Sequence, residues 1–478
     1  MRSTTHTSGL ILATLLASSL FAAGHDFPSS QAQVWPAITA NGSGFMAAWV
    51  VSGPNGRGVE WRAVRGDGEA LAGASTALQT AYSPVAIAHS PSDALVVWIA
   101  DHNIHAQHLS PSGIALTSIE MTAGNGARDI AVSWNGSRYF VVWAEGLRLL
   151  GALIAPEGTP AAPQLLNAPF FTEENETRFP IAPDVAWDGR NFIVVFAEVP
   201  NFVCTQLCPT QFPDQFRVMR VSGAGKPVDA WPIVINGSHV RAHVASSGAE
   251  SLIALDSADR MSTIIAHDAD LLTLDAEAPL FRWSSNVSSA VVWDGASFIV
   301  GWSYRAPDSG PSWMGAAHVT RTGSAFDYRT VATGRPVISE GLQSWGPAMA
   351  VNDNGDAALV SSEVTPQHPQ VRLYLISEFA PMPAPPPPPR NVISSFGGST
   401  SRLDWQQSES PAGFELEFSW DFGRSWGFYR NIAGDGRTAT VYASVGNLFR
   451  VSAFGPGGVS EGTVTSIGSM PRTRAQRR

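Results

Sequence analysis

One pattern recurs seven times between Trp35 and Ala380: a strand opened by a turn or a proline, a tight turn such as Asn-Gly or Asp-Gly, and an apolar run that usually ends in an aromatic residue. Successive runs end 45 to 59 residues apart. A repeat this short cannot bury its own apolar residues, so the seven units must pack on one another. The runs are FMAAW ending at Trp49, ALVVW at Trp98, YFVVW at Trp143, FIVVF at Phe196, SLIAL at Leu255, FIVGW at Trp302 and AALVS at Ser361.

A period of this length, built only of short strands and turns, is typical of the four-stranded blade of a β-propeller. We therefore predict an all-β fold with a seven-bladed β-propeller over residues 25–380. The apolar runs do not alternate with polar residues, because a strand between two neighbouring blades is buried on both faces. The strand before each run carries small residues that suit the innermost position, where blades converge: Ala37, Ala86, Ala131, Ala186 and Ala350.

The two ends of the repeat array predict how it closes. The seventh repeat passes from its third strand, Val371 to Phe379, directly into proline and has no fourth strand. Asp26 to Val34 occupies the place of a fourth strand before the first repeat. We expect this N-terminal segment to complete the last blade and so remove the exposed sheet edges.

Composition narrows the possible partners. The chain has 44 Gly and 34 Pro in 478 residues, as a turn-rich all-β protein requires. Its net charge of −10 argues against nucleic acid, since phosphate binding needs clustered Lys and Arg. The chain has no glycine-rich phosphate loop and no serine nucleophile elbow, so we predict no cofactor and assign no catalytic residue.

Residues 1–24 have the features of a secretory signal peptide. Arg2 supplies the positive start, Leu10 to Ala23 the apolar stretch, and Ala22-Ala23-Gly24 a small-residue cleavage site. The apolar stretch is too short to span a bilayer, and we expect no transmembrane segment elsewhere. We therefore expect a secreted protein, located outside the cell, at its surface or in the periplasm.

Cys204 and Cys208 are the only cysteines, and they share one loop insertion. In an oxidising compartment this spacing favours a local disulfide between them. Two thiolates without nearby histidines make zinc the poorer alternative, and we predict no metal site.

A proline-rich stretch, Pro381 to Pro389, interrupts the pattern. It predicts a stiff linker over residues 381–390, with few contacts across it, followed by a smaller domain over residues 391–470 and a disordered basic tail over residues 471–478. Three segments of the smaller domain alternate with the two-residue period of a sandwich strand: Leu403–Trp405, Phe414–Phe418 and Phe449–Ala453.

This domain resembles a fibronectin type III domain. The resemblance rests on the Trp405 strand, the strand FELEFSW and the later segment LFRVSAFGPGGVS. It covers about 80 residues and implies a small β-sandwich. Phe449 stands where the family has a tyrosine, so the corner hydrogen bond of that tyrosine is absent.

The segment SWDFGRSW, Ser419 to Trp426, fits the Asp box S-x-D-x-G-x-x-W of sialidase-like propellers. Asp421 is expected to accept hydrogen bonds from turn amides, Gly423 to take a positive φ, and Trp426 to pack beneath. In sialidases the box lies away from the active site. The resemblance therefore implies a structural turn here rather than glycosidase activity.

Acidic residues recur just after the apolar runs: Asp101, Glu145, Glu198, Asp256 and Glu363. Their recurrence indicates a structural role within each repeat. A circle of carboxylates at one end of the propeller is the alternative, and it would suit a cation or a sugar. Hydrolysis would need two carboxylates about 5 to 10 Å apart.

Three other patterns are better explained by the repeats. Arg65-Gly66-Asp67 occupies the turn that follows the third strand, and Asn352 to Asp356 aligns with the hairpin turns and lacks the glutamate of a calcium-binding EF-hand. His102, His105 and His108 are spaced so that an extended strand would not place them all on one face. We expect neither integrin-type recognition nor metal binding from them.

The chain as a whole is similar to exported bacterial seven-bladed propellers with a trailing fibronectin-like module, through repeats such as PDVAWDGRNFIVVF. Two functions follow as hypotheses. The first is a secreted or surface binding scaffold whose propeller loops contact a protein or glycan partner. The alternative is a carbohydrate-active enzyme, suggested by the recurring carboxylates and by the accessory fibronectin-like domains of such enzymes.

Overall fold

The fold is all-β and resembles a β-propeller. The computed structural model describes residues 24–27, 29–53, 56–76, 84–123, 127–167, 178–200, 215–237, 239–257, 260–268, 271–282, 288–305, 312–333, 346–396, 400–424, 426–442 and 445–468. Within these ranges the only helical element is the 3₁₀ turn η1 (Ile376–Glu378), and no helix is long and apolar enough to cross a membrane.

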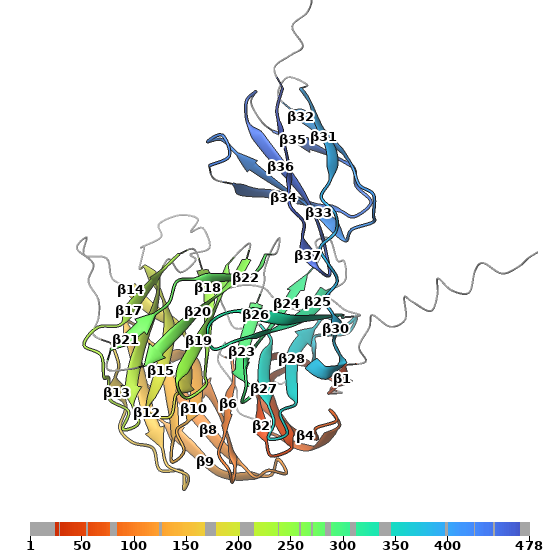
Figure 1. Cartoon of the computed structure of the whole chain (residues 1–478). Helices are drawn as coiled ribbons and strands as arrows, with labels where there is room; N and C mark the ends of the chain where they lie inside the picture. The colour runs from red at the N-terminus through yellow and green to blue at the C-terminus, as the bar shows by residue number, and fades with distance from the viewer. Residues whose placement is uncertain are drawn as a thin grey trace, which may run out of the picture.

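Seven antiparallel sheets, numbered here in chain order, follow one another from residue 25 to residue 381 (Figure 1). Sheet 1 contains β2 (Ala32–Asn41), β3 (Gly44–Gly53), β4 (Gly56–Val64) and β5 (Ala70–Thr76). Sheet 2 contains β6 (Ala86–His89), β7 (Ala94–Ala100), β8 (Asn103–Leu109) and β9 (Ala115–Met121). Sheet 3 contains β10 (Ala127–Trp134), β11 (Tyr139–Glu145), β12 (Arg148–Ile154) and β13 (Gln164–Leu165). Sheet 4 contains β14 (Arg178–Trp187), β15 (Asn191–Pro200), β16 (Gln215–Ser222) and β17 (Ile233–Asn236). Sheet 5 contains β18 (His239–Ser246), β19 (Glu250–Ser257), β20 (Arg260–Asp268), β21 (Leu272–Leu274) and β22 (Ala278–Arg282). Sheet 6 contains β23 (Ser288–Trp293), β24 (Phe298–Arg305), β25 (Ser312–Val319), β26 (Ala325–Ala332) and β30 (Ala380–Pro381). Sheet 7 contains β27 (Ala348–Val351), β28 (Ala357–Glu363), β29 (Gln370–Leu375) and β1 (His25–Asp26).

The first strands of the seven sheets form a closed ring. Each contacts the first strand of the next sheet, and that of the seventh contacts that of the first, through the pairs β2–β6, β6–β10, β10–β14, β14–β18, β18–β23, β23–β27 and β27–β2. Seven buried clusters fill the seven junctions between neighbouring sheets. Second strands lie between two such clusters, and every residue of β7, β11 and β28 is buried. This confirms that the unalternating runs are buried on both faces.

The turns within each sheet follow from their glycines. In the hairpins between first and second strands, Gly136, Gly189 and Gly295 have φ of 89°, 93° and 98°. In the turns between third and fourth strands, φ lies between 76° and 93° at Gly68, Gly113, Gly158, Gly225 and Gly323. Such values favour glycine, because a Cβ would be strained there. The predicted Asn-Gly and Asp-Gly hairpin turns are confirmed.

The N-terminal segment closes the ring on sheet 7. β1 pairs with β29, with His25 opposite Leu373 and Asp26 opposite Arg372. The predicted range, Asp26 to Val34, was too long, because residues 32–34 already belong to β2 of sheet 1. The chain therefore passes from one sheet to the other around Phe27, whose ring is buried 4.8 Å from that of Trp49.

Residues beyond Pro381 form two further sheets that stand beside the ring (Figure 1). The three-stranded sheet contains β31 (Arg390–Phe396), β32 (Ser401–Gln406) and β35 (Thr438–Val441), and the five-stranded sheet contains β34 (Gly427–Ala433), β33 (Gly413–Ser419), β36 (Leu448–Gly455), β37 (Gly458–Val459) and β38 (Thr463–Ser466). One core between the sheets includes Trp405, Leu416 and Phe449.

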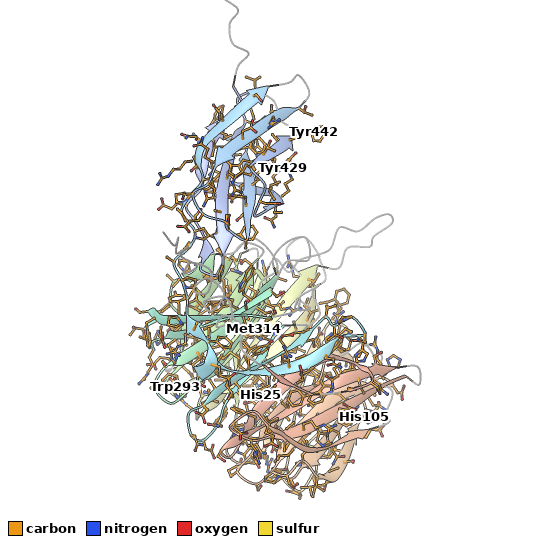
Figure 2. All side chains as sticks on the ribbon, turned by 90° about the vertical axis from the view of Figure 1, so that its right-hand side faces the viewer. His25, His105, Trp293, Met314, Tyr429 and Tyr442 are labelled. Carbon is orange, nitrogen blue, oxygen red and sulfur yellow. The ribbon has the colours of Figure 1, made fainter. Side chains whose placement is uncertain are left out.

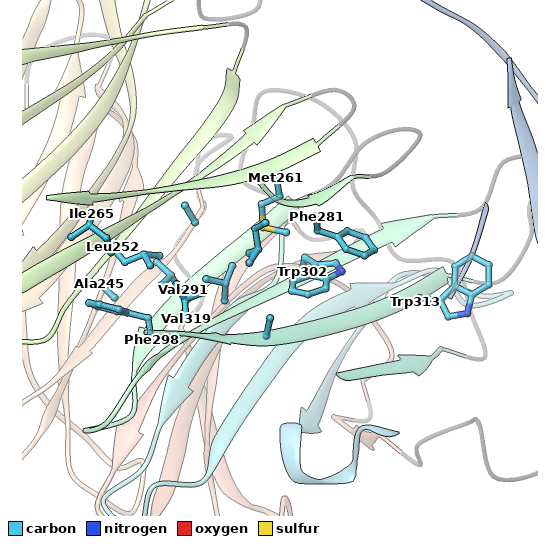
Figure 3. Close-up of a cluster of buried hydrophobic side chains, with 14 of the residues drawn as sticks. Ala245, Leu252, Met261, Ile265, Phe281, Val291, Phe298, Trp302, Trp313 and Val319 are labelled. Carbon is cyan, nitrogen blue, oxygen red and sulfur yellow. The ribbon is translucent and has the colours of Figure 1, made fainter. Parts of the chain in front are cut away.

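The expectation that few contacts cross the proline stretch is wrong. Phe454, from the turn end of β36, is fully buried in the cluster between sheets 5 and 6, and Val459 packs against the same cluster. Figure 3 shows this cluster. The ring of Phe281 stacks on that of Trp302, and Trp313 lies at the start of β25. Apolar residues at this end of the domain thus extend the core of the ring, which the alternation of the strands alone does not indicate.

Ring closure predicts a large cost for losing the side chain of Phe27. Phe27→Ala should lower the free energy of unfolding by about 3 to 5 kcal/mol, because it empties part of the junction between sheets 7 and 1. Phe326→Ala, at a side chain that is 46% exposed, is the matched control and should have little effect. Urea unfolding followed by tryptophan fluorescence measures both. Similar small losses in the two variants would show that the junction does not depend on Phe27.

Candidate functional site

The candidate site is a cavity of about 240 Å³ enclosed by the first strands of all seven sheets. Three of the small residues predicted at innermost positions, Ala37, Ala86 and Ala131, line it. Ala186 and Ala350 do not line it. All five alanines contact the apolar clusters in the junctions between sheets. Small side chains therefore let neighbouring sheets approach one another around the ring.

The polar groups of the cavity lie on one side. Asp129 on β10, Asp184 on β14, and Arg241 and His243 on β18 are its four polar lining residues. Glycine, proline, alanine, valine, isoleucine and methionine make up the rest of the lining. Sheets 3 to 5 thus present charge and hydrogen-bonding groups, and sheets 1, 2, 6 and 7 present an apolar wall.

Each carboxylate in this region reaches across to the next sheet. Asp129 Oδ2 accepts a hydrogen bond from the backbone N–H of Ala182 at 3.0 Å, and Asp184 Oδ2 accepts one from Val244 at 3.0 Å. On the second strand of sheet 5, Asp256 Oδ2 accepts one from Ser289 at 2.9 Å. First strands of neighbouring sheets do not pair as a β-ladder, so these side chains satisfy amides that the ring leaves open.

Two basic side chains complete the cluster. Arg241 Nη1 donates to Ser288 Oγ at 3.0 Å, and its charge lies near Asp129 and Asp256. His243 Nδ1 lies 3.4 Å from Asp184 Oδ2. The side chains of Asp184 and His243 are 30% and 27% exposed, so a ligand in the cavity could contact both.

Burial shifts the pKa values of three groups in this region, Asp129, Asp256 and Arg241. It raises the pKa of Asp129, although a backbone hydrogen bond and two arginine charges oppose the rise. Burial also raises the pKa of Asp256, against the charges of His243 and Arg241, and it lowers the pKa of Arg241, against those of Asp256 and Asp129. Each buried charge therefore depends on its oppositely charged neighbours.

Backbone irregularity helps to place Asp129. It has φ of 45° and lies where the register of β10 with β11 shifts. Ala182 has φ of 46° at the corresponding shift in β14, and Trp35 has φ of 56° in β2. A bulge re-aims the side chain that it carries. None of the four polar lining residues was predicted from the sequence. The signal that could have identified them is that they interrupt first strands of small and apolar residues: Asp129, Asp184, Arg241 and His243.

Four of the five recurring carboxylates make structural contacts, and none of the five lines the cavity. Asp101 lies in the turn between β7 and β8. Glu145, Glu198 and Glu363 pair with arginines on the third strand of their own sheets, Arg148, Arg217 and Arg372 respectively. Asp256, opposite Arg241 in the pairing of β18 with β19, interacts electrostatically with Arg241 and His243.

The other sequence patterns are accounted for locally. Arg65 pairs with Glu69 in its turn, and Asn352 Oδ1 accepts the N–H groups of Asn354 and Asp356 within a hairpin. His102 lies in a turn, His105 stacks on Trp98, and the buried His108 contacts Asp93. The described part of the chain contains no group of three His, Cys, Asp or Glu side chains that could hold a metal ion.

The remaining predicted residues lie away from the cavity or outside the described ranges. In the Asp box, Ser419 Oγ donates to Asp421 Oδ1 at 2.7 Å and accepts the Gly423 N–H at 2.8 Å. Gly423 has φ of 86°, and the guanidinium of Arg450 lies 4.5 Å from the ring centre of Trp426. Cys204 and Cys208 fall in residues 201–214, outside the described part of the chain.

Comparison with known proteins gave distant structural similarities only. Neither family models nor curated proteins gave a match. A functionally unknown protein from Desulfotomaculum acetoxidans aligns over 69% of this chain and 95% of its own, at 12% identity and a TM-score of 0.44. The Dos1 propeller aligns over 75% and 84%, at 11% identity and 0.42, and Trypanosoma rangeli sialidase over 94% and 88%, at 10% identity and 0.38. These scores are low, so the description of the fold relies on its sheet order and ring contacts.

A pair of carboxylates, Asp188 and Asp268, lies away from the cavity, between sheets 4 and 5. Asp188 Oδ1 accepts the N–H groups of Arg190 and Asn191 in the hairpin between β14 and β15. Burial and the adjacent Asp268 raise the pKa of Asp188 to about 6. Burial alone would raise the pKa of Asp268 too, but hydrogen bonds from Asp188, Asn191 and Arg220 lower it.

This pair predicts a pH-dependent stability. A carboxyl whose pKa is raised on folding stabilises the fold below its unfolded pKa, and this contribution is lost as pH rises through the folded value. Asp188→Asn should therefore raise the free energy of unfolding by about 1 to 3 kcal/mol at pH 8 and change it little near pH 4. Asn135 occupies the equivalent hairpin position in sheet 3, where its Oδ1 accepts the N–H groups of Ser137 and Arg138. An asparagine side chain therefore fits this turn.

Asp294→Asn is the matched control for this experiment. Asp294 occupies the same hairpin position in sheet 6, but its carboxylate faces Ser297 and His318 rather than a second carboxylate. Urea unfolding at pH 4 and pH 8 compares the variants. An equal gain in both variants, or a gain at Asp188 that does not depend on pH, would contradict the carboxylate pair as the cause.

Proposed function

We propose that this protein is an exported glycan-binding protein, a seven-bladed β-propeller with a fibronectin type III-like module. The seven sheets, the cyclic contacts of their first strands and the pairing of β1 with β29 support the seven blades. The sheet orders β31-β32-β35 and β34-β33-β36-β38 support the module. Export rests on the signal-like residues 1–24, and the disulfide between Cys204 and Cys208 remains part of this proposal.

The observation that carries the function is the two-sided cavity on the ring axis. A sugar ring has hydroxyl groups at its rim and C–H groups on its faces. Carboxylate, guanidinium and imidazole groups on sheets 3 to 5 suit the hydroxyls, and the prolines and aliphatic residues opposite suit the C–H face. A cavity of about 240 Å³ is slightly below the usual range for small-molecule sites. We therefore infer that it takes one sugar residue, such as the end of a glycan.

A glycoside hydrolase is the second candidate, and Asp129 is the observation in its favour. Its raised pKa is what a general acid needs, and Asp184 on the next sheet would be the second carboxylate. Binding is preferred because both carboxylates hold backbone amides of the neighbouring sheet. A general acid changes its protonation in every turnover, which here would weaken a bond that holds the ring together.

A glycan array followed by titration with free monosaccharides tests the proposal. His243→Ala removes a group that contacts Asp184 and lines the cavity, and we expect binding of the sugar to weaken about tenfold or more. His267→Ala is the matched control, since His267 also lies in sheet 5 and pairs with an aspartate, Asp275, but outside the cavity. No binding to any glycan, or an equal loss in both variants, would contradict the proposed site.

Fluorogenic glycosides distinguish the two candidates. We expect no turnover by the wild-type protein. Turnover that is lost in Asp129→Asn, while glycan binding is retained, would overturn the binding assignment and make Asp129 the general acid.

A further inference from the structure

The C-terminal domain carries exposed aromatic side chains at one end. Trp420 and Phe422, in the loop between β33 and β34, are 70% and 85% exposed. Tyr442 and Val445, between β35 and β36, are 76% and 50% exposed. We call these four residues the aromatic tip. Exposed apolar groups gathered in this way commonly mark an interaction surface.

The register of the sheet places the two segments of the tip at the same end of the domain. β33 pairs with β36, with Ser419 opposite Leu448 at this end and Gly413 opposite Phe454 at the other. The N–H of Tyr442 donates to Tyr429 Oη at 3.0 Å and so joins the second segment to β34. Phe454 is buried against the ring, so the aromatic tip lies at the end of β33 and β36 away from it. Figure 2 shows Tyr442 at the edge of the domain and Tyr429 nearer its middle.

The first loop holds its aromatic rings in a fixed and strained arrangement. Phe422 has φ of 61°, which is unfavourable for a bulky residue, yet its side chain is the most exposed of the tip. The Asp box bonds between Ser419, Asp421 and Gly423 hold this turn. Trp420 packs on Phe418, with ring centres 4.6 Å apart, and so is supported from the core side. The strained backbone at Phe422 is therefore not compensated by burial of its side chain. Such strain often occurs at functional sites, which points to a function for the exposed ring.

We propose that the aromatic tip binds a neutral polysaccharide, as a second site that does not depend on the cavity. Its rings would stack on the C–H faces of successive sugar residues. Arg424, also exposed, lies in the same loop two residues after Phe422 and can donate hydrogen bonds to sugar hydroxyls. Rigid aromatic rings lose little conformational entropy on binding.

Charge favours a neutral polymer over an anionic lipid surface. Residues 390–468 contain six arginines and seven acidic residues. Arg450, close to the tip, is already paired with Glu417 through two hydrogen bonds of 2.6 Å. The domain thus lacks the excess of basic residues that draws a protein to acidic lipids. Four more arginines follow in residues 469–478, and the test therefore includes a variant that ends at Gly468.

Affinity electrophoresis of the full chain in gels containing soluble neutral polysaccharides, such as xylan, β-glucan or galactomannan, tests this site. We expect at least one of these polymers to retard the wild-type protein. In Trp420→Ala and Tyr442→Ala the affinity for it should fall about tenfold. Ile393→Ala, at a 65% exposed position on β31 of the same domain, is the matched control and should bind as the wild type does.

Phe422→Gly separates binding from folding. Glycine relieves the positive φ, so this variant should keep or raise the melting temperature while its polysaccharide affinity falls. A purely structural Phe422 predicts the opposite pattern. His267→Ala, at a pair with Asp275 outside both sites, should leave the retardation unchanged.

Three results would overturn the proposal. The first is that none of these polysaccharides retards the wild-type protein. The second is that Ile393→Ala weakens binding as much as the tip variants do. The third is that the tip variants lose binding to vesicles of phosphatidylglycerol and phosphatidylcholine rather than to polysaccharide, whether or not the chain ends at Gly468.

Discussion

Closure of the ring between sheets 7 and 1 is the constraint on which the other features depend. β1 contributes only two residue pairs with β29, so its hydrogen bonds alone are a weak lock. The stronger contribution comes from Phe27, buried against Trp49 in the junction, and from Gln33, whose Oε1 accepts the Val371 N–H at 2.9 Å. An open ring would leave the apolar faces of sheets 1 and 7 in water, and the second strands there have no polar face to show.

The closed ring also explains the polar side of the cavity. Its first strands approach one another without forming ladder hydrogen bonds, so exposed amides need other acceptors. Asp129, Asp184 and Asp256 supply them between sheets 3 and 6. Burying Asp129 and Asp256 costs free energy, which their amide hydrogen bonds and the charge of Arg241 offset. The groups that hold the sheets together are thus fixed before any ligand arrives, and a ligand needs to order little on binding.

Much of the ring could be predicted from the sequence because its determinants are local and repeated. The turn glycines, the buried runs and the missing fourth strand of the seventh repeat each indicate a structural requirement in the residues themselves. The cavity could not be predicted in this way. Its polar residues occur in three sheets only, whereas the carboxylates that do recur, such as Glu145 and Glu198, pair with arginines in their own sheets. A residue that recurs in every repeat meets a structural need that all sheets have. The cavity, in contrast, is polar only where individual first strands depart from the repeat.

The position of Asp129 gives a second reason why the cavity could not be predicted. Asp129 lies at a bulge and has a positive φ, which a non-glycine residue rarely adopts. Docking of the C-terminal domain escaped prediction for a related reason. Phe454 alternates within β36 like any sandwich residue, and only the fold shows that it fills a junction of the ring.

That docking separates the two proposed glycan sites. Phe454, Val459 and the pairing of β30 with β26 hold the ring-facing end of the C-terminal domain, and the aromatic tip lies at the far end of β33 and β36. Strands of seven and eight residues span roughly 20 to 25 Å. One ligand can gain from both sites only if it bridges that distance. A short oligosaccharide would therefore bind at the cavity as if the tip were absent, whereas a long polymer could be held at the tip while its end reaches the ring.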